Sequence, residues 1–288
     1  MSRDRARPGV PSDWEVVGGR GFGPFVTEES YSRPDGTTAT WSSRAHRKGH
    51  GLQHADIRPS HRWLVLLWRP QRLTWWIASF FIVGSLLFAL GSFPAYFNSL
   101  DPRVVGITFF VGSVFFTSAA SLQFIEAVNA PSNVATKAAS VRNWRVWTWQ
   151  PRRIDVWATT IQLVGTLLFN LSTLAALIES LDVQQEERLV WAPDMLGSIA
   201  FLTASYLAYA EVCHRAWCWH QPGVSWTIVA LNLIGSVAFG VAALAAFILP
   251  TTGEVLNITL VNIGTFIGAI CFLLGAYLLF PEMLLNEE

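Results

Sequence analysis

The chain has 288 residues, of which 52% are hydrophobic and only 14% are charged, and its 20 basic and 20 acidic residues leave no net charge. A soluble domain carries roughly 25% charged residues, and a nucleic-acid-binding domain carries a basic excess, so the composition favours neither class and predicts no nucleic-acid partner. Beyond residue 72 the charge is sparse, and uncharged runs of about 18 or more residues recur, as in transmembrane helices. We therefore predict an all-α, polytopic membrane protein.

Residues 1–60 differ from the rest of the chain because they are rich in Gly, Pro, Ser, Arg and His. Gly18-Gly19 and Arg33-Pro34-Asp35-Gly36 are typical of turns, and no apolar period runs through the segment. The sequence predicts a mostly disordered cytoplasmic tail. His46, His50 and His54 recur at four-residue spacing, which would suit a metal if the segment were helical. Gly49 and Gly51 weaken such a helix, so a polar tail that happens to contain histidines is the favoured interpretation.

The predicted transmembrane domain covers residues 61–288. Tryptophan and proline mark the entry to three of its helices, in the segments 68–76, 149–157 and 219–226. Proline suits the first turn of a helix, and tryptophan suits the membrane–water interface. The shorter apolar segment Trp63–Trp68 is predicted to lie at that interface.

The apolar runs predict six transmembrane helices, at about 73–97, 104–127, 154–178, 192–213, 224–248 and 256–280. They are predicted to form three repeated helical hairpins, at about 68–128, 149–213 and 219–283. The first helix of each hairpin carries two apolar residues, Gly, Ser or Thr, two apolar residues and Phe; the second carries Gly followed four residues later by Phe. Small residues let helices approach closely in lipid, so we predict helix packing at Gly84, Gly112, Gly165, Gly197, Gly235 and Gly268.

A glutamate follows fourteen residues after the glycine of each second helix: Glu126, Glu211 and Glu282. At about 100° per residue, each glutamate returns to the face of its glycine. If that face points inward, three carboxylates converge at the cytoplasmic end and are candidates to bind a cation. Alternatively, each glutamate ends its span in water or pairs with a nearby Lys or Arg.

Two cysteines and two histidines cluster after the fourth predicted helix: Cys213, His214, Cys218 and His220. These residue types bind zinc or iron, so they are candidate metal ligands, although their spacing is neither CxxC nor HxxxH. The three cysteines of the chain predict no disulfide framework. No cofactor is predicted.

Basic residues predict the orientation. Eighteen of the Lys and Arg residues precede the first helix or follow the second and fourth helices, and only Arg103 and Arg188 lie on the other side. Positive residues stay on the cytoplasmic side, so we predict a multi-pass protein of the cell (inner) membrane with both termini cytoplasmic. Its partner is the lipid bilayer, and the basic residues would suit anionic headgroups on that side; the sequence sets no oligomeric state. The acidic loop 179–191 is predicted to form a short helix on the outer surface.

The spans carry no charged residue at their middle, which proton-coupled pumps and ion-coupled transporters usually need. Catalytic sequence motifs are also missing, so we predict that the protein is not an enzyme. The sequence favours a structural, sensing or scaffold role, and the alternative is a small-solute or cation channel or transporter through a pseudo-threefold helical bundle. A continuous polar path through the bundle would separate the two.

The hairpin resembles the YrhK-type domain, a small bacterial membrane domain. The resemblance rests on Trp75-Trp76, Gly84-Ser85, Phe88 and Gly91-Ser92, followed by Gly112 and Phe116, and it is best over about residues 70–130. It implies a membrane hairpin, here in three tandem copies, and implies no activity or catalytic residue.

Overall fold

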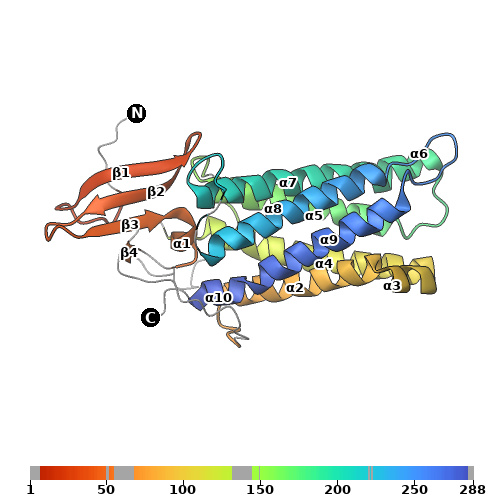
Figure 1. Cartoon of the computed structure of the whole chain (residues 1–288), viewed down its shortest axis with the longest axis horizontal. Coiled ribbons are helices and arrows are strands. Elements are labelled where there is room, and N and C mark those ends of the chain that lie inside the picture. The colour runs from red at the N-terminus through yellow and green to blue at the C-terminus, as the bar shows by residue number, and fades with distance from the viewer. Residues whose placement is uncertain are drawn as a thin grey trace.

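The computed structural model describes residues 7–49, 52–54, 68–131, 145–148, 150–219, 221 and 223–284. About 65% of the chain is helical. Long helices lie side by side in an elongated bundle, and a small sheet extends from one end of it (Figure 1). The strand β1 and the helix α10 lie at this same end, so the two termini of the described chain are on one side of the bundle (Figure 1).

Six helices of the described chain are long and apolar enough to cross a membrane. They are centred on α2 (Leu73–Ser92), α4 (Pro102–Val128), α5 (Ile154–Ala175), α7 (Ala192–Cys213), α8 (Val224–Ala245) and α9 (Ile258–Tyr277). Side chains cap two of the starts: Asp101 accepts from the Arg103 amide, and Asn257 accepts from the Leu260 amide. The predicted six-helix, multi-pass architecture is confirmed.

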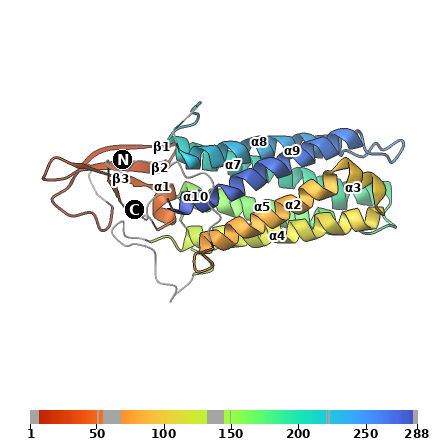
Figure 2. The same cartoon turned by 60° about the horizontal axis from the view of Figure 1, so that its bottom comes forward.

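The six helices form a closed ring. Within each hairpin the partners pack against each other, as α2 on α4, α5 on α7 and α8 on α9. Neighbouring hairpins meet through α4 and α5, through α7 and α8, and through α9 and α2, which closes the ring (Figure 2). Exposed apolar side chains, among them Leu86, Leu167 and Ile234, cover the outside of the ring. Because lipid is as apolar as these side chains, such a surface is stable in a bilayer.

Short helices extend or connect the spans. The helix α3 (Pro94–Ser99) follows α2, and α10 (Leu279–Leu284) follows α9. The acidic segment 179–191 is helical from residue 183, as α6 (Val183–Glu186) and a π-helical turn, η2 (Glu187–Trp191), and it continues directly into α7. The short helix predicted for this loop is therefore present as an extension of α7, and its place on the outer surface stays a prediction. The Ser172 hydroxyl donates to the carbonyl oxygen of Val190 at 2.8 Å, which pairs a backbone group within the π turn.

The N-terminal segment forms a four-stranded antiparallel sheet in the order β1 (Glu15–Phe22), β2 (Phe25–Ser32), β3 (Thr38–Ser42) and β4 (Gln53–His54). The helix α1 (Ser43–Arg47) follows β3 directly. The sheet packs Tyr31 and Trp41 into a small core, and the Arg7 guanidinium stacks 3.4 Å from the centre of the Trp41 ring.

The prediction of a mostly disordered tail is wrong for residues 7–49, and the turn residues show why. Gly23 and Gly36 have φ of +54° and +79°, so they close the β1–β2 and β2–β3 turns rather than breaking structure. Buried residues recur at even spacing, at Thr27 and Tyr31 in β2 and at Ala39 and Trp41 in β3. Half of these inward positions are polar or small, so the period of two is weak in the sequence. The rest of the predicted tail and the segment 63–67 lie outside the described residues, apart from residues 52–54.

Candidate functional site

The predicted packing glycines lie where the two helices of each hairpin touch. A Cβ atom on Gly84 would lie 2.7 Å from the Phe116 ring and 3.0 Å from the Gly112 carbonyl oxygen. Gly165 and Gly235 face the carbonyl oxygens of Gly197 and Gly268 in the same way, at 3.2 and 3.1 Å. Close backbone approach of this kind is how helices associate in lipid.

A tier of phenylalanines fills the centre of the bundle next to these glycines. Ring centroids lie 5.1 Å apart for Phe169 and Phe201, and 5.9 Å apart for Phe116 and Phe272. The cavity left between the rings has a volume of about 10 Å³. The phenylalanine tier, as we call it, comprises Phe88, Phe116, Phe169, Phe201, Phe239 and Phe272.

The helix α1 lies at the sheet end of the bundle and brings three cations to it. It begins after Ser42, whose Oγ accepts from the Ala45 amide at 3.2 Å. Arg44, Arg47 and the following Lys48 are spaced by three and four residues, so they share one face of this short turn of helix. Their side chains are mostly buried, at 12%, 9% and 6% exposure.

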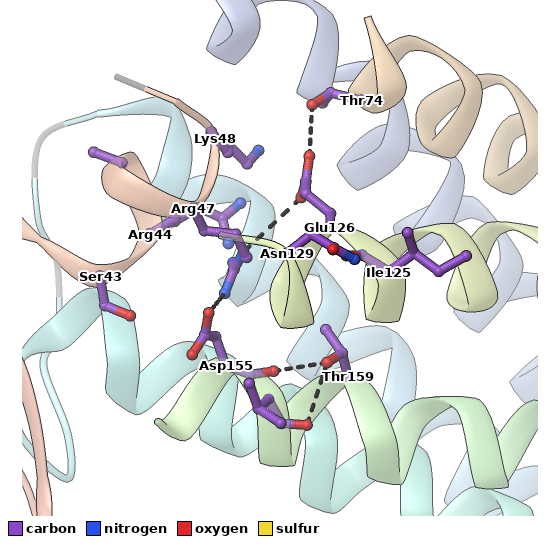
Figure 3. A network of polar contacts seen from close by, with 12 residues as sticks. Ser43, Arg44, Arg47, Lys48, Thr74, Ile125, Glu126, Asn129, Asp155 and Thr159 are labelled. Carbon is purple, nitrogen blue, oxygen red and sulfur yellow. Dashed lines mark hydrogen bonds and ion pairs between the residues drawn. The ribbon is translucent and has the colours of Figure 1, made fainter. Parts of the chain in front are cut away.

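Arg47 is shared by three carboxylates from three different helices, and Figure 3 shows two of them, Glu126 and Asp155. Its Nη1 lies 3.2 Å from Asp155 Oδ2 and 3.4 Å from Glu211 Oε1, and its Nε lies 3.9 Å from Glu126 Oε2. Burial by itself lowers the pKa of Arg47, but Glu211, Asp155 and Glu126 outweigh it and raise that pKa. Arg47 therefore stays charged, and it links α4, α5 and α7 at the end of the bundle.

Glu282 holds the other two cations of α1. Its Oε1 lies 2.7 Å from Arg44 Nε, its Oε2 lies 3.1 Å from Arg44 Nη2, and Lys48 Nζ contacts the same carboxylate. The Ser225 hydroxyl also donates to Glu282, at 2.5 Å. Burial lowers the pKa of Lys48, and the nearby Glu282 carboxylate opposes this.

In each hairpin, the residue that lies ten positions before the packing glycine of the first helix decides, by its chemistry, what the glutamate binds. In the first hairpin it is Thr74, whose hydroxyl donates to Glu126 at 2.9 Å, and in the third it is Ser225. In the second hairpin it is Asp155, which is acceptor-only when ionised. There the α1 helix supplies the donors, because Ser43 donates to Glu211 at 2.6 Å and Arg47 bridges Glu211 and Asp155. This substitution explains how α1 contacts the second hairpin; Arg153 Nε also pairs with Asp155, at 3.1 Å.

The three predicted glutamates thus lie at one end of the bundle, around a single helix. Glu211 and Glu282 are 1% and 4% exposed, so they do not end their spans in water, and the alternative that they pair with Lys or Arg is confirmed. Their candidacy as a site for a free cation stays a prediction; within the described residues no group of His, Cys, Asp and Glu side chains is arranged to hold a metal ion. Sequence reasoning missed α1 and Asp155, although the Ser42 cap and the basic spacing after it were readable.

The cysteine and histidine cluster is not a thiolate metal site. Cys213 and Cys218 form a disulfide, which removes both thiolates and corrects the prediction that the cysteines make no disulfide framework. The bond closes the turn after α7, where His214 has φ of +54° and ends the helix. The Nδ1 atom of His214 lies 2.9 Å from Thr27 Oγ1, and its Nε2 atom lies 3.2 Å from Glu28 Oε2, so this turn contacts β2. Burial lowers the pKa of His214, against the pull of Glu28; His220 lies outside the described residues.

The N-terminal histidines do not share one helix, because α1 ends at Arg47. His46 is buried, and its Nε2 lies 2.7 Å from the carbonyl oxygen of Pro131. His54 belongs to β4, and His50 is outside the described residues. The hypothesis of a metal-binding face formed by His46, His50 and His54 on one helix is therefore wrong.

A polar cavity of about 60 Å³ separates α1 from the phenylalanine tier. Arg44, Arg47, Asp155 and Glu211 line its α1 end. The lining also includes the amide side chains of Gln123, Gln162 and Asn232, and the ring of Phe272 from the tier. The bundle is thus polar on one side of the tier and capped there by the cations of α1.

Comparison of the chain with models of protein families, with curated protein sequences and with solved structures gives no match. The class of protein therefore rests on the fold. Six apolar helices in a closed ring define an integral, multi-pass membrane protein.

Proposed function

We propose that this protein is a membrane-embedded sensing module, in which the N-terminal sheet reports the state of the helical bundle. The observation that carries the proposal is the Arg47 guanidinium, which is shared by Glu126, Asp155 and Glu211 at the end of the bundle. Any movement among α4, α5 and α7 changes the distances from these carboxylates to Arg47. Because Arg47 is on α1, and α1 follows β3 without a linker, the movement reaches the sheet.

The energetics of the contact favour two discrete positions of α1 rather than gradual loosening. Removing one partner of a buried ion pair costs about 3–5 kcal/mol, because the other charge stays buried and uncompensated. A partly separated α1 would leave charges buried without partners in this way, so intermediate positions are unfavourable. Docked, the cations of α1 and the carboxylates neutralise one another; withdrawn, both sets return to water. A contact of this kind is a bistable element, which a sensing mechanism requires.

We infer further that the three hairpins are copies of one unit of the YrhK type. The support is that Gly, Phe and Glu recur at equal offsets, and that the Gly and Phe residues make corresponding contacts in each hairpin. We also propose that the α1 end is cytoplasmic in the cell membrane, which the 18-to-2 distribution of basic residues supports.

The alternative of a solute or cation pathway is less well supported. The phenylalanine tier crosses the centre of the bundle, and the polar cavity lies on one side of it. Conduction would need six packed rings to separate. A sensing module needs no such opening.

Trypsin tests the proposal, because α1 holds its own cleavage sites. Arg44, Arg47 and Lys48 are buried when α1 is docked, so cleavage after them reports undocking, whereas the Arg20 side chain is 75% exposed and serves as an internal reference. In lipid nanodiscs we expect slow cleavage at 44–48 in the wild-type protein. Glu211→Gln should accelerate it at least tenfold relative to cleavage after Arg20, and Glu179→Gln, which neutralises an exposed carboxylate, should leave it unchanged.

A bundle substitution far from α1 separates sensing from static attachment. Gly84→Leu pushes α2 away from α4 at the phenylalanine tier, where the atoms nearest to the added Cβ belong to Phe116 and Gly112 rather than to α1. A sensing module predicts faster cleavage at 44–48 in this variant. Unchanged cleavage, with the bundle still helical by circular dichroism, would show that the sheet is only attached and would overturn the proposal.

A further inference from the structure

The polar cavity between α1 and the phenylalanine tier carries an inference about a ligand. Its volume of about 60 Å³ is several times the ~10–15 Å³ that one water molecule requires. Apolar side chains, including Phe81 and Phe272, form much of its wall. Three amides from three different helices, α4, α5 and α8, supply polar groups between these apolar walls: Gln123, Gln162 and Asn232.

The amides are placed as a layer. Gln162 and Asn232 are each three residues before the glycine of their first helix, and Gln123 is eleven residues after Gly112 on a second helix. The corresponding positions in the other hairpins are Phe81, Ala208 and Leu279, and all of these line the same cavity. The layer thus contains three amides among apolar and small side chains. A layer built only to fill space would use apolar residues throughout, since lipid-embedded interiors give polar groups no water.

One amide lacks a hydrogen-bond partner in the described part of the chain. The Oε1 atom of Gln123 is buried and makes no hydrogen bond there. A buried polar atom without a partner destabilises a protein, so it marks a place where a donor from another molecule would be favourable. Side-chain amides carry both donors and an acceptor, so the layer can satisfy a solute that has both.

The charges at the mouth of the cavity balance. Two cations, Arg44 and Arg47, and two carboxylates, Asp155 and Glu211, line it, and Arg47 pairs with both of these carboxylates. A cationic or anionic solute gains no net attraction from a neutral set and loses its own hydration. The site therefore favours an uncharged solute.

We infer that this cavity binds a small uncharged solute of the amide class, with its amide group held by Gln123, Gln162 and Asn232. The effect of binding rests on the proposed function: a solute in the cavity would set the position of α1, which lies over the cavity. Binding of the solute would then change the position of the sheet through α1. The binding step itself requires only the cavity.

Three isosteric probes with four heavy atoms each separate the ligand classes: acetamide, which is neutral, acetamidinium, which is cationic, and acetate, which is anionic. A solute of this size binds no tighter than tens of micromolar, roughly, given the ceiling on free energy per atom. Saturation-transfer NMR on the methyl resonance suits such affinities. With the full chain in nanodiscs, we expect transfer to acetamide at least fivefold above that to either charged probe.

Variants of the cavity residues test whether the saturation transfer to acetamide arises from binding in the cavity. Gln162→Leu combined with Asn232→Leu should abolish transfer to acetamide, and Gln184→Leu, an exposed amide at the far end of the molecule, should preserve it. If the double variant fails to fold, Gln123→Leu alone should lower the transfer at least threefold. A cavity filled by water alone would give no transfer to any probe, and stronger transfer to acetamidinium would assign a cation; either result overturns the inference. Trypsin cleavage at 44–48 without a probe tests docking separately, so the two proposals fail in different experiments.

Discussion

Arg47 and Glu282 show how single side chains set the cost of separating α1 from the bundle. Arg47 keeps two carboxylates if one is removed, whereas Glu282 is the carboxylate that pairs with both Arg44 and Lys48. The loss of Glu282 therefore leaves two buried cations without this partner. The loss of Glu126 leaves Arg47 with Asp155 and Glu211.

Neutralising these two glutamates should have unequal effects on the free energy of unfolding. We expect Glu282→Gln to cost about 3–5 kcal/mol, as for other broken buried ion pairs. Glu126→Gln should cost about 1 kcal/mol, because its Thr74 hydrogen bond can be kept. Denaturant titration in mixed micelles measures both values, and equal costs would contradict the unequal sharing of charge.

Acid should weaken the structure through His46. Burial lowers the pKa of His46 from its ordinary 6.5, and the Nδ1 atom is buried without a partner within the described chain. The folded state thus keeps the ring neutral while the unfolded state takes up a proton below about pH 6.5. Stability is therefore fully present above pH 6.5 and falls as the pH drops from 6.5 toward the folded-state pKa.

The slope in this window should approach 1.4 kcal/mol per pH unit for one histidine, roughly, and His214, whose pKa is also lowered, adds to it. Unfolding titrations at pH 7.5, 6.5 and 5.5 measure the slope. His46→Gln should reduce it relative to the wild-type protein. An unchanged slope in this variant would show that His46 does not carry the effect.

The helical hairpins are the elements in which spacing in the sequence translates most directly into contact. At Gly84 and Gly112 the backbones of α2 and α4 lie close together. By contrast, a Cβ atom added to Gly240, on the surface of α8, would meet no neighbouring atom within 4 Å. These positions offer a matched comparison of glycines inside helices.

Gly84→Ala should destabilise the bundle by about 1–3 kcal/mol, the usual cost of overpacking. Gly240→Ala should be neutral or stabilising by up to about 1 kcal/mol, because alanine favours the helix and meets nothing. Thermal unfolding of both variants in the same detergent measures the difference. Equal effects would mean that close backbone approach does not limit packing at Gly84.

The sequence predicts the spans well because burial in lipid requires long apolar runs, which any window detects. It also predicts the shared stripe of Gly, Phe and Glu, since helical geometry fixes the angle between them. The sheet is different: its strands are short, and Thr27 and Ala39 carry its inward pattern as much as Tyr31 does. The docking of α1 depends on Arg47 meeting Asp155, 108 positions later in the printed sequence, and no local pattern encodes such a contact.

The orientation of the whole molecule is a separate prediction, and two of its features point in different directions. Basic residues predict that the sheet end is cytoplasmic, whereas the Cys213–Cys218 disulfide is of a kind commoner in oxidising compartments. We give more weight to the basic residues because their asymmetry extends over the whole chain. Reporter fusions or accessibility labelling should place Gln184 and Gly253 outside and Ala138 and Gln221 in the cytoplasm. An outside signal at Ala138 would reverse the orientation and leave the docking of α1 unaffected.

The central claim is that α1 holds the sheet against the acidic end of the bundle, and a distance between the two parts tests it most directly. Spin labels at Asp35, in the β2–β3 turn, and at Arg215, after α7, are both exposed, and Cys271→Ser removes the free cysteine. Pulsed electron spin resonance in nanodiscs should give one narrow distance distribution. Arg44→Glu combined with Arg47→Glu should broaden it, because like charges then face the carboxylates. The docked arrangement would be contradicted if the labelled Cys271→Ser protein already gave a broad distance distribution and the two charge reversals did not change it.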